Sequence, residues 1–453
     1  MSDFFGSVWW LIVSLGLLVT FHEFGHYWVA RRNGVKVLRF SIGFGRPLWM
    51  RRGRDGTEYA IAAIPLGGYV KMLDEREAPV AADEASQAFN RKSVGQRMAI
   101  VAAGPAANLL LCVALLWAMF VVGRPDYAPV VGHAQGVAAE AGLARGDRIE
   151  AVGERATPTW NEVQMALLPA ALDRADVRLQ VVDANGNAGE RVLALSKLAP
   201  DLDDRALLPA VGVLPRHLLA PPVIGRVHPD SAAWGVLAED DRVTAVDGSP
   251  VATFDQIGPL VQALGERGGA AMIEVERNGD RLALEVTPRL VQDAARGDFW
   301  ALGIESARAE VPAKDALQRY GPLEAVPAAL RETAHLTGQL VGMIGRAFTG
   351  RIAVENTVAG PITIARATNA YAQQGVAWYL TILALLSLSL AILNLLPIPL
   401  LDGGHLLYYL IELVKGSPVS ERAMAAGQTV GLVLLAGLMG LAFYNDILQL
   451  VQR

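Results

Sequence analysis

The 453-residue sequence has a single cysteine, Cys112, and a mild net charge of −5. One cysteine excludes a disulfide within the chain and argues against a zinc site built on thiolates. Because Cys112 stands in an apolar run, we interpret it as a small core or lipid-facing residue. The near balance of 40 basic and 45 acidic side chains gives no reason to expect nucleic acid as a partner. The N-terminus also lacks the basic segment and the small-residue cleavage site of a removable signal peptide.

Apolar residues, in contrast, are plentiful, at 52% of the chain, and the mean hydropathy is +0.31. These values are high for a soluble protein and low for a pure membrane bundle, so they predict membrane helices with sizeable aqueous domains between them. A spanning helix needs about 20 apolar residues. Four segments meet this length, and they run from about Phe4 to Ala30, Met98 to Val122, Val376 to Leu396 and Met424 to Phe443.

Basic residues set the expected orientation. They follow the first apolar segment and precede the second: Arg31, Arg32, Lys36, Arg39, Arg46, Arg51, Arg52, Arg54, Arg91, Lys92 and Arg97. Loops rich in Lys and Arg stay on the cytoplasmic side. We therefore expect this loop to be cytoplasmic, and both termini and the long region 123–375 to lie on the other side of the membrane.

The cytoplasmic loop contains an unusually apolar stretch, Thr57 to Met72, in which two apolar runs flank Pro65 and two glycines. This pattern predicts a β-hairpin, and its apolar character indicates association with the membrane edge. An exposed strand can hold an extended peptide through main-chain hydrogen bonds. The candidate substrate-binding residues in this stretch are Gly67, Gly68, Tyr69 and Val70.

The long extracytoplasmic region contains an internal repeat with a period of about 93 residues. Pro129–Gly132 recurs as Pro222–Gly225, and Asp147-Arg148-Ile149 recurs one residue out of step as Asp241-Arg242-Val243. The first copy resembles PDZ domains, whose signature is met by Gly142, Leu143, Gly146, Asp147, Ile149 and Val152. The second copy has an extra residue and no glycine at the position of Gly146. We expect its peptide-binding loop at Ile224 and Gly225.

After the repeat, Leu323 to Phe348 carries apolar residues at helical spacing. This spacing predicts an amphipathic helix. Two interpretations remain open, a helix that packs near the membrane and a helix that closes the second repeat.

The chemistry of the chain starts from His22-Glu23-Phe24-Gly25-His26, inside the first apolar segment. Two histidines four residues apart share one face of a helix and can bind the same metal. Zinc lowers the pKa of a bound water to about 7, and an adjacent carboxylate can take its proton. Ionisable residues are costly inside a membrane, so this cluster predicts a functional zinc site with Glu23 as the general base.

A catalytic zinc also needs a third protein ligand and an open position. The candidate is Asp402, which follows Pro397 and Pro399 in the third apolar segment. The prolines break the helix, so we expect Asp402 on irregular backbone that reaches the first helix. Alternatively, Asp402-Gly403-Gly404 is only a turn at the membrane interface, and His405 is a rival ligand that we favour as an interfacial residue or a neighbour of the site.

Two amides stand among apolar neighbours: Asn108, in the Gly104-Pro105-Ala106-Ala107-Asn108 run, and Asn394. Both are candidates for polar groups of the active site. The alternative for each is hydrogen bonding between helices, next to small residues that let helices approach closely.

Together these motifs resemble the site-2 protease family of intramembrane zinc proteases, over nearly the whole chain, and in particular members with two PDZ domains inserted between the second and third helices. The resemblance implies zinc bound by His22, His26 and Asp402, with Glu23 as general base. It also implies single-span membrane substrates already shortened outside the membrane, such as an anti-sigma factor in the envelope stress response, and remnant signal peptides. The bilayer is then a partner, and the location is the inner membrane.

The expected fold is therefore a membrane protein of four transmembrane helices with a membrane-associated β-hairpin and two inserted β-rich PDZ domains. The expected boundaries are a first helix at 1–33, a cytoplasmic loop with the hairpin at 34–95, a second helix at 96–123, PDZ domains at 124–215 and 216–306, a periplasmic amphipathic region at 307–375, a third helix with the aspartate ligand at 376–412, and a cytoplasmic turn with the fourth helix at 413–453.

Two other functions compete with the protease. A membrane-tethered PDZ scaffold or chaperone without catalysis would not need Glu23, Asp402 and both histidines together. A zinc transporter or sensor would need further ligands along a path, and His133, His217, His228 and His335 have no metal-binding spacing.

Overall fold

A computed structural model describes residues 2–199, 202, 204–292, 298–308, 312–350 and 359–451. The chain forms two compact units, Met1–Pro125 with Gln318–Arg453, and Asp126–Leu317. We call the first the helical unit and the second the module unit. The expected amphipathic region 307–375 therefore falls in both units, and its residues 309–311 and 351–358 lie outside the described residues.

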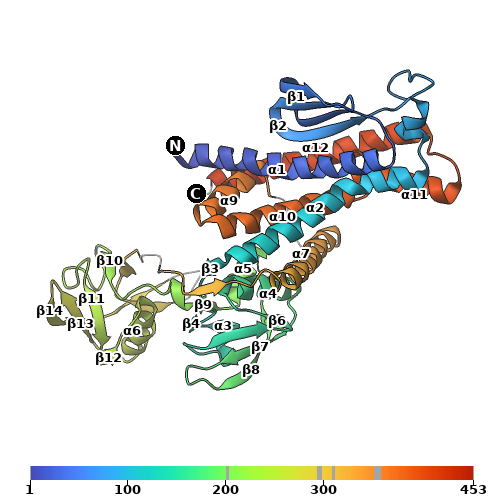
Figure 1. Ribbon diagram of the computed structural model, residues 1–453. Helices are drawn as coiled ribbons and strands as arrows, with labels where there is room; N and C mark the ends of the chain where they lie inside the picture. The colour runs from blue at the N-terminus through green and yellow to red at the C-terminus, as the bar shows by residue number, and fades with distance from the viewer. Residues whose placement is uncertain are drawn as a thin grey trace. The chain divides into compact units, whose positions relative to one another are not determined.

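The helical unit contains four helices that are long and apolar enough to cross a membrane, which confirms the four predicted segments. They are α1 (Ser2–Arg32), α2 (Val94–Val122), α10 (Val376–Leu395) and α12 (Glu421–Val451). The described part of this unit also contains short 3₁₀ turns at Ala85–Gln87 and Phe89–Arg91, α7 (Ala325–Phe348), α9 (Pro361–Gln373) and α11 (Asp402–Lys415), with β3 (Arg124–Asp126) and β18 (Ala316–Gln318) at its borders. α2 packs against α1 and α10 (Figure 1).

Small residues bring α1 and α2 together. A Cβ atom added at Gly25 would lie 2.2 Å from the carbonyl oxygen of Ala103. Helices approach this closely only where one of them carries no side chain at the contact. α2 begins at a capping box between Ser93 and Gln96 and ends at Gly123, which has a φ of 91°. These signals fix the register of α2 against the histidine-bearing face of α1.

The predicted amphipathic helix is α7, Ala325–Phe348. It packs on α2 within the helical unit, where Cys112 contacts the Thr333 hydroxyl at 3.9 Å. Of the two interpretations of this helix, packing against the apolar helices is therefore the observed one.

The two strands of the apolar loop, β1 (Val37–Arg52) and β2 (Glu58–Met72), form a two-stranded antiparallel sheet. The hairpin predicted within Thr57–Met72 is wrong in its pairing, because the partner of β2 is the preceding segment. Each residue from Arg39 to Ile42 pairs twice, once in Glu58–Ile61 and once in Gly68–Lys71. The two apolar runs around Pro65 therefore pair with the same segment of β1, one on each side, and not with each other. In Figure 1 the sheet lies beside α1, with which β1 and β2 are in contact.

The region 376–412 contains two helices, in agreement with the break predicted at the two prolines. α10 ends at Leu395, a short non-helical link carries Pro397 and Pro399, and α11 begins at Asp402. Asp402 is thus the first residue of a helix, and the expectation that it lies on irregular backbone is wrong. The link includes Leu400, whose φ of 87° is unusual for a residue with a branched side chain.

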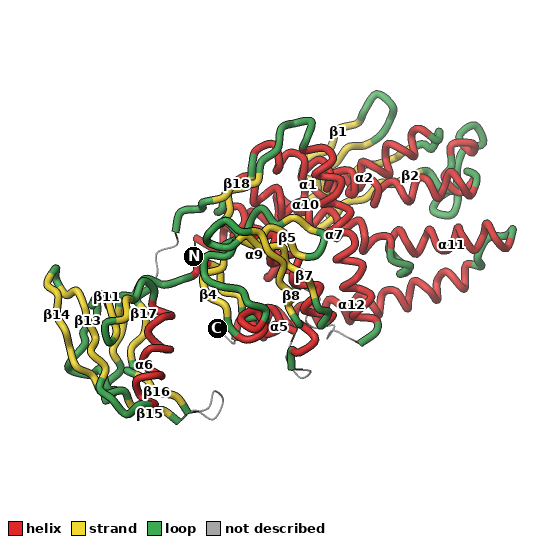
Figure 2. The backbone as a smooth tube through the Cα atoms, turned by 90° about the horizontal axis from the view of Figure 1, so that it is seen from below, coloured by secondary structure: helices red, strands yellow, loops and turns green. Residues whose placement is uncertain are grey.

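The module unit repeats one arrangement twice. Each copy has a four-stranded sheet, in the orders β6-β5-β7-β8 and β12-β11-β13-β14, and a separate strand pair, β4-β9 and β10-β17. The first copy contains β4 (Val131–Ala134), α3 (Gly136–Glu140), β5 (Arg148–Val152), β6 (Arg155–Ala156), α4 (Trp160–Asp173), β7 (Val177–Val182), β8 (Ala188–Leu193), a 3₁₀ turn at Leu195–Lys197, α5 (Asp204–Ala210), β9 (Val213–Pro215) and a 3₁₀ turn at Arg216–Leu218. The second contains β10 (Ile224–Val227), β11 (Arg242–Val246), β12 (Ser249–Pro250), a 3₁₀ turn at Phe254–Gln256, α6 (Ile257–Glu266), β13 (Ala271–Arg277), β14 (Asp280–Val286), β15 (Arg289–Val291), β16 (Phe299–Ala301) and β17 (Ile304–Ser306). Figure 2 shows the strands grouped within each copy of the module unit.

The missing glycine of the second copy is replaced by an aspartate in the same conformation. Gly146 has a φ of 94° and its N–H bonds to the Val131 carbonyl, while Asp240 has a φ of 68° and bonds to the Ile224 carbonyl. Aspartate tolerates this left-handed region better than most residues. The turn geometry is therefore kept despite the extra residue.

Ile224 and Gly225 lie on strand β10 and not in a loop, so the predicted loop at these residues is wrong. Ile224 is fully buried and its strand pairs with β17. A Cβ atom at Gly225 would lie 2.5 Å from Cα of Ala307, which shows that another backbone already occupies this side. A role of the two residues in binding peptides stays an untested prediction.

Candidate metal centre

Three predicted residues from two distant parts of the chain meet at one point. Nε2 of His22 and Nε2 of His26 lie 3.2 Å apart, and they lie 3.2 and 3.4 Å from Oδ2 of Asp402. The histidines come from consecutive turns of α1 and the aspartate from the start of α11. Among the described residues, these three form the one group of histidine, cysteine and carboxylate side chains close enough to hold a metal ion.

Helix α2 packs directly against the two imidazoles because it carries no side chain at the contact. A Cβ atom at Gly104 would lie 2.2 Å from Nε2 of His26 and 2.8 Å from Cε1 of His22. From the same helix, the Ile100 carbonyl accepts a 2.8 Å hydrogen bond from Nδ1 of His26. The proton of that imidazole is therefore on Nδ1, and the lone pair of Nε2 points toward Asp402.

Asp402 reaches the histidines because α11 turns back sharply on the proline link. Cβ atoms at Gly403 and Gly404 would lie 2.1 Å from the Leu396 carbonyl oxygen and 2.5 Å from that of Ile398. The two glycines thus serve close packing and not the turn considered above. The position at the N-terminus of α11 favours a negative charge, because the helix dipole is positive there.

The three atoms suit zinc. Tetrahedral zinc with bonds of about 2.0–2.2 Å holds its ligand atoms roughly 3.3–3.5 Å apart, close to the separations here. Oδ2 of Asp402 is buried and has no hydrogen-bond donor, which is costly for a carboxylate oxygen unless a cation balances it. Two nitrogens and one oxygen, without sulfur, also form the donor set of catalytic zinc sites that keep one position open.

Glu23 lies beside this centre, on the wall of a cavity of about 490 Å³ that also contains the three ligand side chains. Strand β2 packs directly against Glu23, since a Cβ atom at Gly68 would lie 3.1 Å from Cγ of Glu23. The backbone N–H of Val70 faces the Glu23 carboxylate. The predicted substrate-binding residues Gly67, Gly68, Tyr69 and Val70 all line this cavity.

The remaining predicted polar residues fall in different places. Asn394 lines the cavity. Asn108 is fully buried on α2, where its amide lies 3.3 Å from Nδ1 of His22. His405 lies on α11 with an exposed side chain and is not part of the ligand group, which disfavours the rival assignment.

One pair of residues near the site was not predicted. Arg97 on α2 donates a 2.7 Å bond to Glu412 on α11, and its guanidinium stacks on Tyr409. Both charged side chains are nearly buried. The pair joins the helix that packs on the histidines to the helix that carries Asp402. A charged residue at the start of an apolar segment was the available signal, but we assigned Arg97 only to the orientation of the loop.

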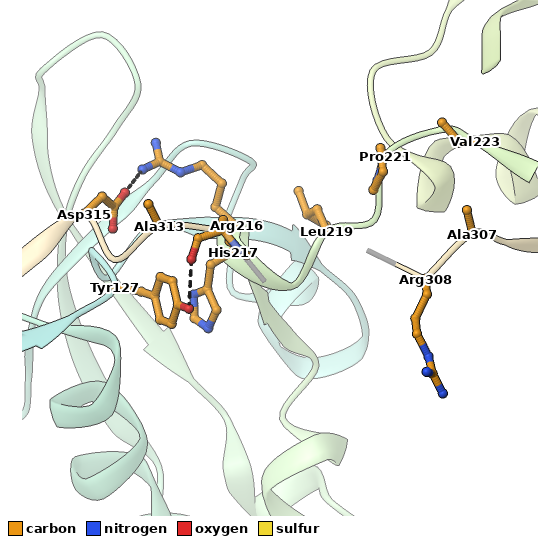
Figure 3. A pocket seen from close by; sticks show the side chains of 11 residues that line it. Tyr127, Arg216, His217, Leu219, Pro221, Val223, Ala307, Arg308, Ala313 and Asp315 are labelled. Atoms are coloured by element: carbon orange, nitrogen blue, oxygen red, sulfur yellow. Dashed lines mark hydrogen bonds and ion pairs between the residues drawn. The ribbon is translucent and has the colours of Figure 1, made fainter. Parts of the chain in front are cut away.

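A second cavity, of about 500 Å³, lies within the module unit and carries no predicted site residue (Figure 3). Its lining includes the stacked rings of Tyr127 and His217, 3.9 Å apart, and the ion pair of Arg216 with Asp315. Burial lowers the pKa of His217, against the opposing effect of Asp126 and Asp315. The described part of this cavity holds no group of metal ligands.

Comparison with known proteins links this geometry to a chemistry. Residues 10–438 match the model of peptidase family M50. The chain is 56% identical over 448 residues to a putative zinc metalloprotease of Xylella fastidiosa (strain 9a5c), covering 99% of this chain and 100% of that one. It is 41% identical over 457 residues to the regulator of sigma-E protease RseP of Escherichia coli (strain K12), covering 99% and 100%. A putative zinc metalloprotease of Vibrio cholerae is 35% identical over 459 residues, covering 99% and 100%.

Proposed function

The chain belongs to peptidase family M50, the site-2 proteases, and we propose that His22, His26 and Asp402 hold its zinc while Glu23 acts as the general base. It is a zinc metalloendopeptidase with a site-2 protease function in regulated intramembrane proteolysis. The observation that carries the residue assignment is the convergence of the three ligand atoms next to a carboxylate in one cavity.

Each residue of the site has a separate task. When bound, zinc supplies Lewis acidity, which makes water a nucleophile near neutral pH and polarises the peptide carbonyl. Glu23 takes the proton of the attacking water and returns it to the leaving amine. Since Glu23 is not among the converging ligand atoms, it stays available for this transfer.

The substrate peptide is held in extended form by strand β2. Peptide bonds within a helix are shielded by their own hydrogen bonds, so a transmembrane substrate must unwind before it is cut. The Gly67–Met72 part of β2 pairs with β1 on one edge, and no other described strand pairs with it. Its second edge faces the cavity and can bind a peptide backbone. Asn394, on the same cavity, is then a polar contact for the substrate.

The protein would lie in the inner membrane with four spans, the basic loop in the cytoplasm, and both termini and the module unit in the periplasm. Exposed Leu48, Trp49 and Met50 on β1 support association of the sheet with the membrane edge. The proposed boundaries are 1–33, 34–95, 96–123, 124–215, 216–306, 307–375, 376–412 and 413–453, with the segment 376–412 divided between α10 and α11.

The two copies of the module unit act as PDZ domains. The two copies share the same strand order and the same turn before Asp147 and Asp241, which supports this assignment. A pair of compact domains would exclude substrates that still carry a bulky periplasmic domain, and so would admit single-span proteins after a first cut. The name of the Escherichia coli relative supports an anti-sigma factor of the sigma-E envelope stress response as one substrate. Remnant signal peptides are a second class.

The test compares the wild-type protein with Glu23→Gln on truncated single-span substrates in liposomes. The variant should keep its zinc and lose proteolysis by at least about 10²–10⁴-fold, because an amide cannot accept the proton. Cleavage near the wild-type rate, with zinc bound, would refute the role of Glu23. Substrate binding by wild type without any cleavage of the whole panel would favour a PDZ scaffold instead.

A further inference from the structure

Asn108 is the one buried side chain of α2 that touches a metal-ligand candidate through a polar atom. Its side chain is fully buried, and Nδ2 lies 3.3 Å from Nδ1 of His22. The other end of the amide, Oδ1, is buried without a hydrogen-bond partner. A buried carbonyl oxygen without a donor costs on the order of 1–3 kcal/mol, so this arrangement needs a reason.

The reason follows from a comparison of His22 with His26, the other histidine of the site. Neutral histidine carries one proton, so a ring that offers Nε2 to a metal must hold its proton on Nδ1. In His26 that proton is bonded to the Ile100 carbonyl. His22 also turns Nε2 toward Asp402, so its Nδ1 must be a donor too. It then needs an acceptor where the Asn108 amide lies.

We propose that Asn108 turns Oδ1 toward His22, accepts the Nδ1 proton and thereby fixes His22 in the tautomer that binds zinc through Nε2. This inference rests on the proposed metal centre. A half-turn about the last side-chain bond exchanges oxygen and nitrogen within nearly the same shape. The exchange gives Oδ1 the donor that it lacks. Asn108 is therefore a positioning residue and does not touch the substrate.

The two ligands are thus held in different ways. His26 depends on a backbone carbonyl that no side-chain substitution removes, whereas His22 depends on one amide side chain. Partners of this kind orient metal-binding histidines, and their loss commonly weakens metal binding about 10–100-fold. Within this site, His22 is the ligand whose hydrogen-bond partner at Nδ1 a single substitution can remove.

A purely structural role of Asn108 in helix packing can be separated from this one. The Asn108 backbone carbonyl accepts a 2.8 Å hydrogen bond from the Ser387 hydroxyl on α10, and Ser387 is fully buried. Ser387→Ala removes this bond between helices but leaves the amide beside His22. It is therefore the matched control.

The experiment measures the zinc dissociation constant of the full-length protein in detergent by competition with a chelator. Asn108→Leu should raise the dissociation constant about 10–100-fold. Asn108→Asp, which keeps an acceptor of the same shape, should stay within a few-fold of wild type, as should Ser387→Ala. Equal zinc affinity of Asn108→Leu and wild type, or equal losses in the Leu and Asp variants, would overturn the inference.

Histidine-selective ¹⁵N NMR of the metal-free protein gives a readout that packing alone would not move, because zinc bound at Nε2 would itself place the proton on Nδ1. His22 should show a protonated Nδ1 in wild type and in Asn108→Asp, and an unprotonated Nδ1 in wild type would contradict the inference. Asp402→Ala separates a failure of the proposed metal centre from a failure of the proposed role of Asn108. If that variant binds zinc like wild type, the metal centre itself is wrong. If it loses zinc and Asn108→Leu does not, only the role of Asn108 is wrong.

Discussion

Two carboxylates of this chain, the partly buried Asp402 in the helical unit and the fully buried Asp241 in the module unit, have surroundings of opposite kind. Arg277 donates to both oxygens of Asp241 at 2.6 and 2.7 Å, and Ala238 adds a backbone N–H at 2.8 Å. Oδ2 of Asp402 has no donor at all and faces two imidazole nitrogens. The first carboxylate is fully satisfied by the protein, and the second is satisfied only when a cation joins it.

This difference distinguishes a carboxylate that stabilises the fold from one that serves the function of the protein. Buried polar groups are normally hydrogen-bonded, and each exception calls for an explanation. In the described chain, unsatisfied side-chain atoms around the site include Oδ2 of Asp402 and Oδ1 of Asn108. Asp241 shows that the same residue type, placed for stability, finds all its partners. Substitution of Asp402 should therefore impair zinc binding, whereas substitution of Asp241 should impair the stability of its module.

The largest effect is expected for Asp402→Ala. Two histidines alone do not make a tetrahedral catalytic site, so the variant should lose zinc and all measurable proteolysis. Metal analysis of the purified protein decides the first and cleavage of a truncated substrate the second. Asp241→Ala is the matched control and should keep full zinc. Full zinc occupancy and normal turnover in Asp402→Ala would show that Asp402 does not differ from Asp241 by binding the metal.

The next effect concerns strand β2, which lines the same cavity as Asp402 and Glu23. Val70→Pro removes the N–H that faces Glu23 and fixes φ, which disturbs both the contact with Glu23 and strand addition, whereas Val70→Thr keeps the N–H and the β-branched shape. We expect a large loss of cleavage for Val70→Pro, a small loss for Val70→Thr, and normal zinc in both. If both variants fold and cleave equally, the sheet holds no substrate and acts only as a lid or brace.

A smaller, selective effect is expected when the module unit is replaced as a whole. The unit ends at Asp126 and Leu317, so the deletion must cover 126–317. With a flexible linker in its place, the protein should keep zinc, still cut short substrates, and also cut substrates with longer periplasmic parts. Selectivity identical to that of wild type, in a cleavage assay over a series of substrate lengths, would refute the filter.

The smallest effect is expected for the satisfied carboxylate. Burial would raise the pKa of Asp241, but the Arg277 guanidinium and the Ala238 amide hold that pKa below its ordinary value. A lowered folded-state pKa stabilises the fold above the unfolded pKa of about 3.9 and loses this contribution as the pH falls through the folded value. Asp241→Asn should cost about 1–3 kcal/mol at neutral pH and remove this dependence below about pH 4.

Hydrogen exchange in the full-length protein measures this stability, in strands β11 and β13 for the second copy and in β5 and β7 for the first. Asp147→Asn in the first copy is the control, because Asp147 accepts the equivalent Ala144 N–H, while Asp183 stands where the second copy has Arg277. The control should change exchange less than Asp241→Asn does. Equal changes in both copies would show that the arginine adds nothing.

Much of this arrangement could be predicted, because its signals are local. Apolar runs of spanning length gave the four helices, and the i, i+4 histidines on α1 gave the metal-binding face. Gly104 could also be assigned to close helix packing, since a residue without a side chain allows it. The meeting of Asp402 with α1 remained a hypothesis because no local pattern fixes a contact across almost 380 residues.

Other features could not be read from the sequence because they depend on distant packing. The partner of β2 is a segment whose pairing follows from the fold and not from Pro65 and its neighbours. Gly403 and Gly404 resembled a turn, but the backbone of the proline link packs against them and lets the helix begin at Asp402. Asp240 took a conformation typical of glycine, which only hydrogen bonds to another strand reveal.

The most direct test of the central claim is anomalous diffraction at the zinc absorption edge from crystals of the full-length protein. We predict one strong peak about 2.0–2.2 Å from Nε2 of His22, Nε2 of His26 and Oδ2 of Asp402, with Glu23 outside the set of protein ligands. A peak bound by His405 in place of Asp402, or a peak in the module unit with none between α1 and α11, would contradict the account.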